Sequence, residues 1–226
     1  MLKHPFTFLL MALCLCFMIA CENKVNKSDV MLQDAPKIIS DIATTSYAIN
    51  PNTSVVKWMS SFRFMPGEHH GNIKIIEGNL ILDGDYMVGG NVLLNMKSIS
   101  DNDLSVTDEN AKLINHLKNT SFFHTDSFAT ALLQITSVVY SFDETKKAQK
   151  AKINAELTIK GIKNAIIIPA DIENINNEIS VVAHFYIDRK IWNLSDEVKQ
   201  VVADPNIEKN GNKDLEFEWL IKADRQ

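Results

Sequence analysis

Four histidines are the residues of this chain whose chemistry first suggests a site. They are His69, His70, His116 and His124, and three or four imidazoles are enough to bind zinc. No carboxylate stands at a fixed ligand spacing from them, however, and adjacent residues of a strand point to opposite faces. The pattern favours ordinary hydrogen-bonding histidines, so we predict no metal site.

Nucleophiles and phosphate-binding loops are the next candidates. The sequence has no Gly-x-Ser-x-Gly elbow and no glycine-rich phosphate loop. Its three cysteines, Cys14, Cys16 and Cys21, all lie near the start, so no thiol nucleophile, disulfide or thiolate-bound metal is expected in the rest of the chain. We therefore predict a protein that is not an enzyme and needs no cofactor.

Arg189 is the charged residue most suited to contact a ligand. A guanidinium can pair with a phosphate or hydrogen-bond a quinone carbonyl. The alternative is a salt bridge, with the adjacent strand or with neighbours of Asp188, that holds a turn. The sequence slightly favours this structural role, and both interpretations stay open.

The start of the chain resembles the signal of a bacterial lipoprotein. An apolar run covers 6–19, shorter than the roughly 20 residues that a membrane-spanning helix needs, and it ends in Ala20 and Cys21. A small residue before the cut and a thiol that accepts diacylglycerol are the features of a lipobox. We therefore predict a signal peptide over 1–20, lipidation of Cys21 and a polar tether over 21–45. An ordinary signal peptide, or an anchor helix with a chance cysteine, is the alternative.

These features predict a location in the bacterial cell envelope. An acylated Cys21 would hold the protein on a membrane, and Glu22, in place of the Asp that commonly signals inner-membrane retention, favours the periplasmic side of the outer membrane. Loss of residues 1–20 removes Lys3 and no acid, so the formal charge of −5 becomes −6. Nucleic-acid binding requires clustered Lys and Arg, so no nucleic-acid partner is expected.

The residues after the tether are predicted to form one domain made mostly of strands. Strand side chains alternate between two faces, and every second residue is apolar in 153–159, 181–187 and 215–221. The stretch 108–118 instead repeats apolar residues at helical spacing after Asp108, a residue suited to a helix cap. The predicted strands cover 47–51, 53–60, 72–83, 87–97, 129–141, 152–160, 164–173, 181–188 and 214–221.

About eight strands with one apolar face each predict an all-β, antiparallel barrel with a single helix near its mouth. Closure leaves no exposed strand edge, and at about eight strands the interior is either filled by side chains or holds one small ligand. The inward positions are apolar or small, so any ligand would be apolar. Periodicity alone leaves the choice between a filled and a hollow barrel open.

A series of short segments, in their order and spacing, resembles the YceI-like family of lipocalin-like barrels, which are associated with binding polyisoprenoid lipids. The resemblance covers 47–223 and implies a lipocalin-like domain over 46–226. The family's usual aromatic-proline pair is absent from 124–128, and no glycine follows Arg189 until Gly211. The segments are 47–51 (YAINP), 54–58 (SVVKW), 69–71 (HHG), 77–80 (EGNL), 89–92 (GGNV), 96–99 (MKSI), 116–118 (HLK), 121–123 (SFF), 157–162 (LTIKGI) and 187–189 (IDR).

The resemblance implies that the barrel binds an isoprenoid quinone or polyprenyl lipid and sequesters or transports it without catalysis. Aromatic side chains could line a hydrophobic tunnel, because a long tail needs only apolar surface, at roughly 25 cal/mol per Å² buried. The alternative is an envelope structural or partner-binding protein whose barrel is filled, in which the same rings are ordinary core. The oligomeric state stays open. The predicted ligand contacts are Trp58, Phe62, Phe64, Phe122, Phe123, Phe128, Phe185, Arg189 and Trp192, with Phe217 and Trp219 in the wider aromatic set.

Overall fold

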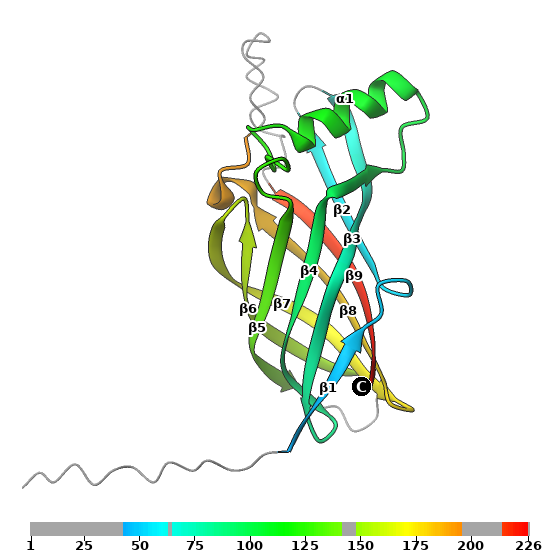
Figure 1. The fold of residues 1–226 in the computed structure, drawn as a ribbon, viewed down its shortest axis with the longest axis vertical. Coiled ribbons are helices and arrows are strands. Elements are labelled where there is room, and N and C mark those ends of the chain that lie inside the picture. The colour runs from blue at the N-terminus through cyan, green and yellow to red at the C-terminus, as the bar shows by residue number, and fades with distance from the viewer. Residues whose placement is uncertain (1–42, 63–64, 142–147, 196–213, 226) are drawn as a thin grey trace, which may run out of the picture. The chain divides into compact units, whose positions relative to one another are not determined.

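The computed structural model describes residues 43–62, 65–141, 148–195 and 214–225, all within Asp41–Gln226, which forms one compact unit. Figure 1 shows long strands wrapped into a barrel, with a helix lying across one end. The predicted signal peptide, Cys21 and most of the predicted tether lie outside the described residues. No helix within the described part of the chain is both long and apolar enough to cross a bilayer.

Nine antiparallel strands are present among the described residues. They are β1 (Thr44–Ile49), β2 (Val55–Phe62), β3 (Met65–Asp83), β4 (Tyr86–Asp101), β5 (Thr130–Ser141), β6 (Gln149–Ile159), β7 (Ile162–Ile175), β8 (Glu178–Asp188) and β9 (Asp214–Arg225). Their order is β1-β3-β2-β9-β8-β7-β6-β5-β4, and β4 pairs again with β3, which closes the sheet. Because β1 and β2 both lie between β3 and β9, they share one position, and the nine strands fill eight. The predicted antiparallel barrel of about eight strands with one helix is therefore confirmed.

The apolar face predicted for the strands forms the inner wall of the barrel. Ile153 and Leu157 of β6 are buried, whereas Lys152 on the other face is exposed. The same alternation runs through β8 and β9. Inward apolar side chains from the whole sheet join in one core, and each buried Leu or Ile contributes about 1.5–3 kcal/mol to stability. β1 begins inside the predicted tether 21–45, so the barrel starts slightly earlier than predicted.

The hairpin of β3 and β4 is longer than predicted. β3 starts at Met65 instead of 72, and β4 runs on to Asp101 instead of 97. The added part of β3 carries an inward-facing histidine, His69, and Gly71, so apolar alternation is interrupted there. At Gly71 a Cβ would lie only 1.7 Å from the carbonyl oxygen of Ser100. Glycine marks a place where two backbones approach too closely for any side chain.

The helix, α1 (Thr107–Lys118), lies where one helix was predicted. The prediction that Asp108 caps it is wrong: Val106 occupies the N-cap position without a side-chain hydrogen bond, and Asp108 lies in the first turn. A negative charge in that turn still interacts favourably with the helix dipole, which accounts for the acidic residue at this place. Leu113 and Leu117 are fully buried, and α1 packs against β4. The helix thereby covers one end of the barrel (Figure 1).

Candidate functional site

The barrel interior contains a small apolar cavity. Its volume is about 20 Å³, and no polar atom is exposed on its wall. A space of this size holds about one water molecule, far less than the roughly 300–1,000 Å³ of a typical ligand pocket. Most of the interior is therefore filled by side chains. Strands β3 to β9 all contribute to the wall, among others with Leu80, Met87, Leu133, Ile153, Ile168 and Trp219.

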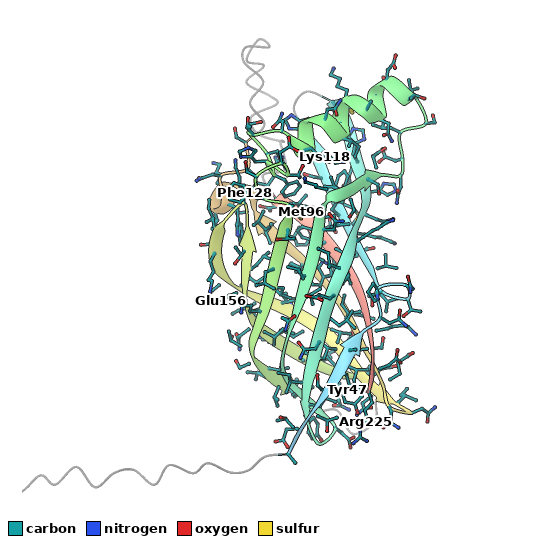
Figure 2. All side chains as sticks on the ribbon, in the orientation of Figure 1. Tyr47, Met96, Lys118, Phe128, Glu156 and Arg225 are labelled. Atoms are coloured by element: carbon teal, nitrogen blue, oxygen red, sulfur yellow. The ribbon has the colours of Figure 1, made fainter. Side chains whose placement is uncertain are left out.

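Aromatic side chains pack the end of the barrel that carries α1. Phe122 and Phe123 are 0% and 2% exposed, and their ring centroids lie 4.8 Å apart in an edge-to-face contact. The ring of His116, in the last turn of α1, lies 5.5 Å from that of Phe122. Phe128 is half-buried at the same end (Figure 2), with its ring 5.6 Å from that of His124. The predicted contacts Phe122, Phe123 and Phe128 thus gather at the helix-bearing end.

A short 3-10 helix, η1 (Arg189–Trp192), follows β8 and packs against the helix-bearing end. The indole N–H of Trp192 donates a buried hydrogen bond to the carbonyl oxygen of Leu157 at 3.2 Å. The backbone N–H of Ser195 donates to the carbonyl oxygen of Ser121 at 3.0 Å, and this bond joins the segment after η1 to the aromatic segment. Trp192, another predicted contact, therefore belongs to the same packed end.

Arg189 is buried here, with 8% of its surface exposed. Its guanidinium carbon lies 5.9 Å from the centre of the Phe122 ring, a distance at which a cation and an aromatic face attract each other. The carboxylate of Asp188 accepts a hydrogen bond from the backbone N–H of Lys190 at 2.9 Å and so caps η1. This position is compatible with both predicted roles of Arg189, the contact to a ligand oxygen and the structural contact.

Trp58 lies on β2. Its indole N–H donates to the carbonyl oxygen of Ser100 at 3.0 Å, so it joins β2 to the last part of β4. The side chain of Phe62 and the whole of Phe64 lie outside what the structure describes. Their predicted role as ligand contacts stays a prediction.

A second aromatic group runs along β8 and β9. Phe185 stacks on Phe217 with ring centroids 5.4 Å apart, and it meets Trp219 edge-to-face at 5.6 Å. Trp219 lines the cavity, and its buried indole N–H has no hydrogen-bond partner among the described residues. None of the nine predicted ligand contacts, as far as they are described, lines this cavity. Trp219 is therefore the aromatic side chain best placed to contact a molecule in the interior.

A polar group lies where β3 and β4 approach α1. Nδ1 of the buried His69 lies 2.8 Å from Oδ2 of Asp103, and ligand atoms of His69, Asp101 and Asp103 all lie within 4.8 Å of one another. Such a group could hold a divalent cation. The sequence alone places no carboxylate at ligand spacing from His69, because only the folded β3–β4 pair brings Asp101 and Asp103 beside it. As predicted, His69 and His70 point to opposite faces, the first buried and the second exposed.

Hydrogen bonds link the two carboxylates of this group to β3 and α1, and each carboxylate changes the pKa of the other. The backbone N–H of His70 donates to Asp103 at 2.8 Å, and the side chain of Asn110 in α1 donates to Asp101 at 3.0 Å. Burial and the neighbouring Asp103 carboxylate raise the pKa of Asp101. Burial alone would also raise the pKa of Asp103, but Asp101, the N–H of His70 and the ring of His69 together lower it. Asp101 therefore holds a proton more readily than Asp103 does, and the hydrogen bonds of the group join the strand ends to the helix.

The cavity wall itself was missed as a set by the sequence analysis, although part of the signal was present. Strand alternation placed Ile153, Ala183 and Trp219 on inward faces, and all three line the cavity. Alternation gives no register between distant strands, so it could not place Leu80 or Met87 opposite them. Aliphatic residues also lack the chemical signature that drew attention to the aromatic ones.

Known proteins share this fold. A family model described as the YceI-like domain matches residues 47–212. The structure of BcnA from Burkholderia cenocepacia superposes with a TM-score of 0.57 at 13% identity, covering 77% of this chain and 99% of that one. A domain from Saccharophagus degradans, described as polyisoprenoid binding and implicated in plant cell wall breakdown, gives a TM-score of 0.52 at 8% identity, covering 80% and 99%. No protein with a curated description matches the sequence.

The family model covers the larger part of the chain, from β1 through η1 to the residues just before β9. The solved structures add an independent likeness in fold. The chain therefore belongs to the YceI-like family.

Proposed function

We propose that the barrel binds the apolar tail of an isoprenoid lipid, a quinone or a polyprenyl lipid, and sequesters or transports it without making or breaking a bond. The observation that carries the proposal is the wholly apolar wall of the interior cavity in a barrel of the YceI-like family. The domain of similar fold described as polyisoprenoid binding supports the same class of ligand. Such a tail needs no polar partner, since apolar burial alone is worth roughly 25 cal/mol per Å².

The size of the cavity decides what binding requires. At about 20 Å³ it cannot take a tail unless inward side chains move aside. Met87 on the wall is unbranched and adaptable, and the neighbouring aliphatic side chains can change rotamer. Displacing packed side chains loses dispersion contacts. We therefore expect reversible binding of moderate affinity, which suits the handover of a lipid between membranes or proteins.

A filled barrel is the second candidate, and the same small volume favours it. In that case the protein is an envelope structural or partner-binding protein, and the inward side chains are only its core. The two candidates differ in whether an apolar molecule is recovered from the interior.

Lipid recovery from two matched variants tests the proposal. Ala183 lines the cavity, whereas the adjacent Val182 is 51% exposed on the outer face. The full chain is purified from its native host and extracted with organic solvent, and the extract is analysed by mass spectrometry. We expect an isoprenoid lipid with the unaltered chain and with Val182→Leu, and about tenfold less with Ala183→Leu, because a loss of some 1.4 kcal/mol corresponds to that factor. Recovery of no lipid from any preparation would establish the filled barrel.

The proposal includes a place in the cell. We infer an anchor at acylated Cys21 that holds the barrel in the bacterial envelope, on the periplasmic side of the outer membrane. The supporting observations are the apolar run 6–19 and its end at Cys21. Metabolic labelling with an alkyne analogue of palmitate should mark the unaltered chain and leave Cys21→Ala unmarked. Equal labelling of both would contradict the anchor, whatever the barrel binds.

A further inference from the structure

The ladder between β7 and β8 covers only part of the two strands. Their residues pair from Ala170 with Ala183 down to Ile175 with Glu178. β7 nevertheless pairs with β6 along 162–172, and β8 pairs with β9 along its full length. Residues 162–169 of β7 and 184–188 of β8 are therefore neighbours without a shared ladder, and we name them the β7–β8 seam.

Proline begins the seam on the β7 side. Pro169 is the residue next to the last paired one, Ala170, and it has no N–H to donate to a neighbouring strand. At the far end the side chain of Asn164 donates to the carbonyl oxygen of Ile191 in η1 at 3.3 Å. The seam is thus bounded by a ladder on one side and by η1 on the other.

The seam begins beside the cavity and beside a groove on the outer face. The cavity is lined by Ile168 and Ala183. An open groove of about 640 Å³ on the outer face is lined by Pro169, Ala170 and His184, among others. Interior cavity and outer groove therefore lie on opposite sides of the same part of the wall, where the ladder ends.

Apolar side chains flank the seam on both faces. On the outer face Ile167 of β7 is 65% exposed and Tyr186 of β8 is 54% exposed. On the inner face Ile162 and Ile166 of β7 are only half-buried, although the inward residues further along β7 are fully buried. An apolar chain crossing the wall here would touch apolar surface on both faces.

Two other routes into the barrel are closed by contacts among the described residues. The helix-bearing end is packed with Leu113, Leu117 and Phe122, which have no exposed surface. The β4–β5 ladder also stops early, at Gly90 and Ile135. There, however, the hydroxyl of Tyr140 bridges the strands by accepting from the N–H of Met87 at 2.8 Å and donating to its carbonyl oxygen at 3.2 Å.

We propose that the lipid tail enters the barrel sideways, through the β7–β8 seam, and not through the helix-bearing end. The inference rests on the proposed function and adds its route. Parting the seam breaks no ladder hydrogen bond, and the side-chain bond from Asn164 to Ile191 lies at its far end. Parting any fully paired strands would break several ladder bonds, each worth about 1 kcal/mol.

A reversible cross-link across the seam tests the route. Cysteines replace Ile167 on β7 and Tyr186 on β8, on the two sides of the seam. A short flexible reagent that attaches through disulfides joins them. The control joins cysteines at Gln134 and Glu156, which are outward-facing partners across the β5–β6 ladder and do not line the outer groove. Both pairs are made in the full chain with its native cysteines replaced by alanine, so that the introduced thiols are the only ones.

The readout is the rate at which menaquinone-4, added in detergent micelles, quenches tryptophan fluorescence, since Trp219 lines the cavity. Closing the seam should slow quenching about tenfold, equivalent to some 1.4 kcal/mol in the barrier, and reduction of the cross-link should restore it. The control cross-link should change nothing. Equal rates with and without the seam cross-link would overturn the route and leave the function standing. No quenching in the uncross-linked chain would overturn both.

A pair of single substitutions covers the case in which the cross-linked chain fails to fold. Ile166 is half-buried at the seam, and Ile114 is half-buried in α1. Ile166→Ala should speed quenching several-fold, whereas Ile114→Ala should leave the rate unchanged. Faster quenching with Ile114→Ala alone would place the route at the helix-bearing end and overturn the proposal.

Discussion

The indole N–H of Trp192 and the carbonyl oxygen of Leu157 form a buried hydrogen bond, 3.2 Å long, between η1 and β6. Hydrogen bonds between strands lie within the sheet, whereas this bond links η1, which follows β8, to β6 at the end of the barrel. Trp219 offers the natural contrast, because its indole is also buried and its N–H has no partner among the described residues. Comparing the two tryptophans therefore separates the contribution of ring packing to stability from the contribution of the N–H hydrogen bond.

Trp192→Phe should lower the free energy of unfolding more than Trp219→Phe does, by about 1–2 kcal/mol. Both substitutions remove part of a ring from the core, but only the first leaves a buried carbonyl oxygen without its donor. Urea unfolding followed by circular dichroism measures the two losses side by side. Equal losses would show that the bond to Leu157 adds nothing beyond packing.

Tyr140 is expected to keep its proton well into the alkaline range. Burial, together with the nearby Tyr86, raises its pKa to about 12, although the backbone of Met87 acts to lower it. A raised pKa means that the folded state favours the neutral phenol, so this stabilisation is complete below the usual value of 10.0 and is lost as the pH rises toward 12. The hydrogen bond to Glu216 also raises the pKa of Tyr186, so ultraviolet titration should show late-ionising phenols, and the contribution of Tyr140 should be missing in Tyr140→Phe.

Tyr140→Phe should also destabilise the barrel at neutral pH, by about 1–2 kcal/mol. The substitution leaves the buried N–H and carbonyl of Met87 without the hydroxyl that bridges β4 and β5. Tyr86→Phe is the matched control, since that ring is 45% exposed. A larger loss of stability in the control would mean that the hydroxyl of Tyr140 does not stabilise the contact between β4 and β5.

Asp101 and Asp103 should respond oppositely to removal of their charge. Asp103 has a lowered pKa, so its ionised form stabilises the fold above its usual value of 3.8, and this contribution is lost as the pH falls below it. Asp101 has a raised pKa, so its contribution is present at low pH and is lost as the pH rises through the folded value. At pH 7, Asp103→Asn should cost about 1–2 kcal/mol, whereas Asp101→Asn should be neutral or stabilising.

Thermal unfolding of both variants from pH 3 to pH 7 checks the sign. The gap between Asp103→Asn and the unaltered chain should close as the pH falls. A metal offers a separate comparison, since a divalent cation bound by His69 and the two carboxylates would raise the melting temperature of the unaltered chain and of neither variant. An unchanged melting temperature in the presence of zinc would leave the group as a structural clamp.

The fold could be predicted from sequence because strand alternation is a local signal. Ile153, Val181 and Leu215 each begin a run whose every second residue points inward. The predicted strand boundaries are wrong where that signal is interrupted, as at the buried His69 in β3. The site was harder, because a cavity depends on the register between strands and on how side chains of many lengths meet. No local pattern contains that information, and none shows that the β7–β8 ladder stops at Ala170.

Gly71 and Gly89 provide a test of backbone spacing in the β3–β4 hairpin. A Cβ on Gly71 would lie 1.7 Å from the carbonyl oxygen of Ser100 and 2.9 Å from Nε1 of Trp58, whereas on Gly89 its nearest contact would be an ordinary 3.8 Å. Gly71→Ala therefore has to push β4 away and disturb the bond between Trp58 and Ser100. We expect a loss of about 3 kcal/mol or more, at the upper end for single substitutions, and less than about 1 kcal/mol for Gly89→Ala. Chemical unfolding measures both, and a tolerated Gly71→Ala would mean that β3 and β4 do not approach this closely.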